Sequence, residues 1–155
     1  MCGIAGVLCF DRAPVDHEDL SVLERPLIPR GPDDSGVWVD QNQNVALLHR
    51  RLAILDLSQD GHQPMARDGR VIVFNGEIYN FKDLRANLHS EGYSFKSESD
   101  TEVLLCLFDL YGPRITDHIR GMYAFAIWDS NNDKLFLFRD PLGICLLYTS
   151  DAADE

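Results

Sequence analysis

Met1-Cys2-Gly3-Ile4-Ala5-Gly6-Val7-Leu8-Cys9-Phe10 opens the chain, and residues 3–10 predict a buried strand that begins almost at the terminus. Such a strand would hold Cys2 inside a sheet. Removal of Met1 would leave Cys2 with a thiol, whose ordinary pKa is about 8.5, beside a free α-amino group of pKa about 7.7–8.0. One residue can then supply a nucleophile and a general base. The alternative is that Cys2 is an ordinary residue at a frayed terminus.

The overall composition is typical of one soluble globular domain. The 155 residues are 45% apolar and 25% charged, and their formal net charge of -11 argues against nucleic acid and against an anionic membrane as partners. The four cysteines show no zinc-type spacing, so we expect no metal site and interpret Cys9 and Cys106 as small buried apolar residues in a reducing compartment. Without a signal-peptide core or a membrane span, the cytoplasm is the expected location.

Strands and helices alternate irregularly along the rest of the chain. The expected helices span 16–25, 80–91 and 100–111, and Asp16 and Asn80 are placed to cap the first two. The expected strands span 36–39, 45–49, 52–56, 71–75, 122–129 and 134–139. Hairpins on both sides of a helical pair predict a mixed, layered α+β fold.

Several segments together resemble the class II glutamine amidotransferase domain, most closely that of asparagine synthetases. In family order they are 1–6 (MCGIAG), 30–33 (RGPD), 49–54 (HRRLAI), 74–80 (FNGEIYN), 98–102 (ESDTE), 121–126 (GMYAFA) and 139–144 (RDPLGI). The resemblance implies an α+β, four-layer αββα sandwich of the N-terminal nucleophile hydrolase type. It also implies hydrolysis of L-glutamine to glutamate and ammonia through a thioester on Cys2.

The predicted catalytic residues are Cys2, Asn75 and Gly76. Attack of a Cys2 thiolate on the glutamine amide creates an oxyanion, which needs donors that are fixed in advance. The Asn75 amide and the Gly76 N–H are expected together at a strand end, and similar enzymes use this pair. Glycine at position 76 lets the main chain approach the substrate without a Cβ. The alternative is that Asn75-Gly76 is a plain turn.

Glutamine is a zwitterion, so its recognition needs a cation and an anion. Arg51 is the candidate for the α-carboxylate, because a guanidinium matches it with two hydrogen bonds, and the resemblance selects it over Arg50. Asp100 and Glu77 are candidates for the α-ammonium group, although Ser99-Asp100 also suits a helix N-cap. The predicted glutamine-binding residues are Arg51, Leu52, Ala53, Ile54, Leu55, Asn75, Gly76, Glu77 and Asp100. We expect loop 30–33 to pack near the nucleophile, and we interpret His49 and His62 as structural.

Residues 145–155 (CLLYTSDAADE) depart from the family's pattern and are more like a translated sequencing adapter. We therefore expect an amidotransferase domain over 1–144, truncated at its C-terminal end, and an atypical tail over 145–155. In synthetases a second domain follows in the same chain, binds ATP and Mg, and transfers the ammonia to aspartate. No cofactor is expected in the segment at hand, and a homodimer is one assembly that the resemblance allows. The alternatives are an inactive truncated fragment and an amidotransferase that acts on another carboxylate.

Overall fold

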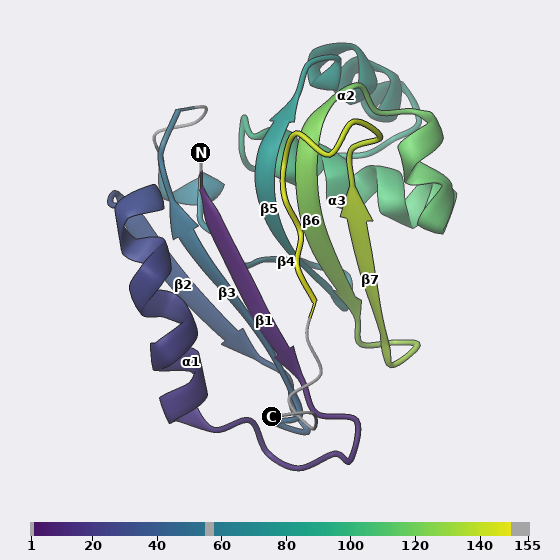
Figure 1. The fold of residues 1–155 in the computed structure, drawn as a ribbon. Coiled ribbons are helices and arrows are strands. Elements are labelled where there is room, and N and C mark those ends of the chain that lie inside the picture. Colours follow the sequence, from purple (N-terminus) through teal and green to yellow (C-terminus); the bar gives the residue numbers. More distant parts are fainter. Residues whose placement is uncertain (1, 55–57, 150–155) are drawn as a thin grey trace.

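Two antiparallel sheets pack against each other, and helices cover their outer faces (Figure 1). The computed structural model describes residues 2–54 and 58–149. The three-stranded sheet has the order β1-β3-β2, and the four-stranded sheet has the order β4-β5-β6-β7. The strands are β1 (Gly3–Leu8), β2 (Asp34–Val39), β3 (Val45–Arg51), β4 (Met65–Arg67), β5 (Arg70–Ile78), β6 (Gly121–Asp129) and β7 (Lys134–Arg139).

The helices form the two outer layers. They are α1 (His17–Glu24), α2 (Phe81–Ser90) and α3 (Asp100–Tyr111), with 3₁₀ helices η1 (Arg25–Arg30), η2 (Gln59–Gly61) and η3 (Gly112–Asp117). Helix α1 covers the three-stranded sheet, whereas α2 and α3 cover the four-stranded sheet (Figure 1). This arrangement confirms the predicted αββα layers. None of the helices in the described part of the chain has the length and apolar character that a membrane crossing requires.

The central strand β5 is buried on both faces, so its sequence is apolar without alternation. Val71 and Val73 pack between the two sheets, while Ile72 and Phe74 pack under α3. Side chains of successive strand residues point to opposite faces, which explains this division. The run 71–74 therefore forms the contact between two hydrophobic cores, one on each side of its sheet.

The structure corrects the prediction that a strand ends at Asn75. Strand β5 continues to Ile78, because β6 pairs with it as far as the Ile78–Gly121 position. Asn75 and Gly76 consequently lie within a strand, and their interpretation as a turn is wrong. A short strand, β4, precedes β5 and was missed.

Two other strand predictions also need correction. The predicted strand over 52–56 is wrong at 52–54, which follow the end of β3, and 55–56 lie outside the described residues. Strand β1 ends at Leu8 and is only partly buried, because it lies at the edge of its sheet. Cys9, just beyond it, is half-buried rather than buried, while Cys106 is buried as expected.

The helix caps follow the sequence in two of three cases. The Asp16 carboxylate accepts from the Glu18 N–H at 2.9 Å, and the Ser99 hydroxyl accepts from the Glu102 N–H at 3.3 Å. Asn80 occupies the N-cap position of α2 as predicted, but its side chain makes no cap hydrogen bond. Its amide instead accepts from the Arg120 N–H at 2.9 Å and donates to the His118 carbonyl oxygen at 3.0 Å, which ties the start of α2 to the chain before β6.

Phe125→Ala tests the core beneath α3. The Phe125 ring is fully buried, with ring centroids 4.6 Å from Phe138 and 5.5 Å from Tyr123. We expect the free energy of unfolding in urea to fall by about 3–5 kcal/mol. Phe10→Ala is the matched control, because 86% of Phe10 is exposed, and it should change the free energy by less than about 0.5 kcal/mol. Equal losses in the two variants would contradict this assignment of the core.

Candidate active site

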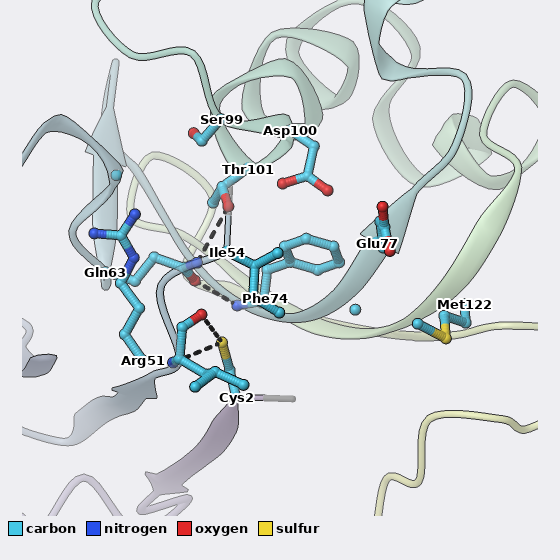
Figure 2. Close-up of a pocket in the computed structure, with 13 residues that line it drawn as sticks. Cys2, Arg51, Ile54, Gln63, Phe74, Glu77, Ser99, Asp100, Thr101 and Met122 are labelled. Carbon is cyan, nitrogen blue, oxygen red and sulfur yellow. Dashed lines mark hydrogen bonds between the residues drawn. The ribbon is translucent and has the colours of Figure 1, made fainter. Parts of the chain in front are cut away.

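A pocket opens where the end of β3 faces the edge of β5 and the start of α3 (Figure 2). Of the residues predicted to act or to bind glutamine, those that line it are Cys2, Arg51, Leu52, Ile54, Gly76, Glu77 and Asp100. Asn75 and Ala53 do not line it, and Leu55 lies outside the described residues. Tertiary structure thus gathers most of the predicted set from four separate segments.

Cys2 is held at the pocket by the segment that follows β3. Its Sγ accepts from the Leu52 N–H at 3.4 Å, while β1 pairs with β3 from Gly3 onward. Its carbonyl oxygen accepts from Arg30 Nε at 3.1 Å. Half-buried Cys2 is therefore held by one hydrogen bond at its thiol and another at its backbone.

The loop 30–33 packs beside Cys2, as predicted. The Asp33 N–H donates to the Arg51 carbonyl oxygen at 3.0 Å, and the Asp33 carboxylate accepts from the Ala53 N–H at 2.8 Å. A Cβ on Gly31 would collide with the Arg50 backbone, so only glycine permits this approach. The loop consequently fixes the backbone of residues 51–53, of which Arg51 and Leu52 line the pocket.

One edge of β5 presents an unpaired N–H group to the pocket. Strand β4 pairs with β5 only over 70–72, so the alternate N–H groups beyond Ile72 have no strand opposite them. The Phe74 N–H donates to Gln63 Oε1 at 2.7 Å, and the Ile78 N–H donates to Asp100 Oδ2 at 3.1 Å. Between them, the Gly76 N–H has no acceptor among the described residues. It is therefore available to an oxygen of a bound ligand.

Position 76 accepts only glycine for a steric reason. A Cβ there would collide with the Met122 carbonyl oxygen and would lie 2.7 Å from the Tyr123 Cα. The constraint comes from the paired strand β6, and the predicted approach of substrate adds a second reason for glycine.

Asn75 is buried, with 5% of its surface exposed, and its Oδ1 has no hydrogen-bond partner among the described residues. Residues two apart in a strand share a face, so Asn75 points toward the three-stranded sheet, as Val73 does. Buried polar atoms are normally hydrogen-bonded, and an unpaired one is costly. The unpaired atom of Asn75 is an acceptor, so a ligand can satisfy it with a hydrogen-bond donor.

Positive and negative groups lie on opposite sides of the pocket. Figure 2 shows the Arg51 guanidinium on one side and the Asp100 and Glu77 carboxylates on the other. Arg51 is buried, and its Nη1 donates to the Ser58 carbonyl oxygen at 3.0 Å. The neighbouring Arg50 instead pairs with Glu24 at 3.2 Å. This charge separation suits an amino acid zwitterion.

The N-cap of α3 and the acidic pocket group are different residues. Ser99 caps the helix, which leaves the Asp100 carboxylate free to turn toward β5. The pKa of Asp100 is raised to about 6, first by burial and also by the nearby Glu77 carboxylate, while backbone N–H donors act in the opposite direction. Two acidic groups close together at this end would favour a cation between them.

Several pocket residues were not predicted. Gln63, Phe74, Ser99, Thr101 and Met122 also line the pocket. Ser99 and Thr101 flank Asp100, so their proximity was implicit in the sequence, but nothing in the sequence around Gln63 pointed to the site.

His49 is structural, as expected: its Nε2 donates to the Phe74 carbonyl oxygen at 3.1 Å, and burial lowers its pKa to about 4.

Comparisons with known proteins identify a family and several relatives for this chain. The glutamine amidotransferase domain family model matches residues 1–155. Asparagine synthetase [glutamine-hydrolyzing] 1 of Bacillus subtilis is 40% identical over 100% of the chain and 25% of that protein. Asparagine synthetase B of Escherichia coli is 40% identical over 96% of the chain and 26% of that protein. The chain thus spans about a quarter of the length of these curated relatives.

A solved structure supports the fold. Glutamine phosphoribosylpyrophosphate amidotransferase from B. subtilis superposes with a TM-score of 0.56 and 24% sequence identity. The match covers 65% of the chain and 24% of that protein.

Asp100→Asn tests the buried carboxylate. The folded-state pKa of about 6 lies above the ordinary value of 3.8. The stability that Asp100 contributes is therefore fully present below pH about 4 and is lost as the pH rises through 6. The substitution removes this dependence. Relative to wild type, we expect the variant's free energy of unfolding in urea to rise by about 2 kcal/mol between pH 4 and pH 7.

Asp117→Asn, at an exposed aspartate, is the control and should follow the wild type across the same range. A difference between D100N and wild type that stays constant with pH would contradict the raised pKa of Asp100.

Proposed function

The chain belongs to the glutamine amidotransferase domain family, and on that premise we propose that it hydrolyses L-glutamine to L-glutamate and ammonia in this pocket. The observation that carries the proposal is the unpaired Gly76 N–H on the wall of a pocket that Cys2 also lines. A thiol and a fixed N–H donor facing one cavity are the two groups that acyl transfer needs.

In the proposed complex, glutamine lies between the charged ends of the pocket. Arg51 holds the α-carboxylate, while Asp100 and Glu77 hold the α-ammonium group. Leu52 and Ile54 form the adjoining wall. This orientation directs the glutamine side-chain amide toward Cys2 and the Gly76 N–H, which also line the pocket.

The chemistry begins after Met1 has been removed. The free α-amine of Cys2 takes the thiol proton, and the thiolate attacks the side-chain carbonyl carbon of glutamine. The oxyanion receives hydrogen bonds from the Gly76 N–H and the Asn75 amide. The carbon–nitrogen bond then breaks as the amine returns its proton to the leaving nitrogen. Water, deprotonated by the same amine, attacks the glutamyl thioester and releases glutamate.

We propose that the ammonia passes to a synthetase domain of the same protein, as the names of its relatives imply. Aspartate is the proposed acceptor, and ATP and Mg²⁺ would act in that domain rather than at this pocket. The cytoplasm is the proposed compartment, since a reducing environment keeps the Cys2 thiol free.

Cys2→Ala should abolish glutamate release from glutamine, because no other described thiol lines the pocket. A coupled glutamate assay measures the loss, and intact-mass measurement of the wild type should show that Met1 is absent. Cys9→Ala is the matched control and should retain activity, since Cys9 lies outside the pocket. Undiminished hydrolysis by protein that retains Met1 would sink the free-amine mechanism.

Asn75→Ala should lower kcat for glutamine about 100–1000-fold, the usual effect of removing one oxyanion donor. KM should change little, because Arg51 and Asp100 hold the other end of the substrate. Steady-state kinetics separates the two constants. Asn87→Ala, at an exposed amide on α2, serves as the control. A rise in KM with unchanged kcat would assign Asn75 to ground-state binding instead.

A further inference from the structure

Gln63 is a buried amide between the two walls of the pocket. It lies in the loop between η2 and β4 and is 5% exposed. Its Oε1 accepts from the Phe74 N–H of β5 at 2.7 Å, and its Nε2 donates to Thr101 Oγ1 of α3 at 3.1 Å (Figure 2). One side chain therefore joins the sheet edge to the start of the helix.

Only an amide of this length makes both contacts. The edge of β5 beyond β4 offers a buried N–H at Phe74, which requires an acceptor. The Thr101 hydroxyl, also buried, receives the donor end of the same amide. A glutamine side chain carries an acceptor and a donor on one planar group, so it satisfies both elements at a fixed separation.

The two residues that Gln63 contacts, Phe74 and Thr101, are sequence neighbours of the proposed functional residues. Phe74 directly precedes Asn75 and Gly76, and Thr101 directly follows Asp100. Each end of the Gln63 amide makes a hydrogen bond to protein when the pocket is empty. Through these two bonds Gln63 fixes the position of its neighbours.

We propose that Gln63 is a positioning residue for glutamine hydrolysis, which sets the separation between the oxyanion donors on β5 and the ammonium-binding carboxylate on α3. This inference rests on the proposed function. It assigns the two contacts of Gln63 to different kinetic constants. The Thr101 contact governs binding through Asp100, and the Phe74 contact governs the transition state through Asn75 and Gly76.

The test compares Thr101→Val, Thr101→Ser and Gln63→Met in steady-state glutamine hydrolysis. Thr101→Val removes only the helix contact and should raise KM about 10-fold with kcat nearly unchanged. Thr101→Ser keeps the hydroxyl and should restore KM to within about 2-fold of wild type. Gln63→Met removes both contacts and should also lower kcat about 10-fold or more, since small displacements of catalytic groups are costly.

A structural control separates positioning from general destabilisation. Asn80 is an amide that also bridges two backbone groups, but outside the pocket. Asn80→Ala should lower the thermal midpoint and leave kcat and KM unchanged. If the Gln63 and Thr101 variants behave in the same way, the inference is overturned. If Gln63→Met does not fold, the KM of Thr101→Val against Thr101→Ser decides. Wild-type protein that releases no glutamate would overturn the proposed function itself.

Discussion

The open edge of β5 is the constraint on which the rest of the site depends. Strand β4 covers only 70–72, so the polar backbone groups beyond it need partners from elsewhere. Gln63 and His49 satisfy Phe74, and Asp100 satisfies Ile78. The Gly76 N–H between them has no acceptor among the described residues. The pocket is thus a gap in sheet pairing, bordered by side chains that complete the pairing on either side of it.

The start of α3 places the Asp100 carboxylate beside that gap, because other residues cap the helix. Ser99 caps the helix. The buried Glu102 carboxylate accepts hydrogen bonds from the backbone N–H groups of Lys96 and Ser97 at 3.0 and 2.7 Å. These two residues satisfy the backbone where the loop enters the helix. Asp100 is therefore not needed for the cap and can face the pocket. Burial at this end raises its pKa to about 6, which makes a cationic ligand the natural partner.

Cys2 reaches the gap because the two sheets meet there. Strand β1 pairs with β3 from Gly3, so Cys2 lies beside Leu52, where β3 has ended. Loop 30–33 crosses the same point and binds the backbone at Cys2, Arg51 and Ala53. The N-terminus is consequently held by hydrogen bonds from two segments. A free terminal amine needs such restraint to act as a base at a fixed place.

Local sequence determined the helices, the cap at Asp16, the layered α+β class and, through motifs, most residues that line the pocket. These features depend on residue type and on neighbours a few positions away. Three features depended on tertiary structure: the extension of β5 through Gly76, the exposure of β1, and the link through Gln63. Strand ends are decided by the partner strand, as β6 does for β5, and burial depends on whether a strand lies at an edge. Gln63 joins Phe74 and Thr101, which are far from it in sequence, so no local pattern encodes that contact.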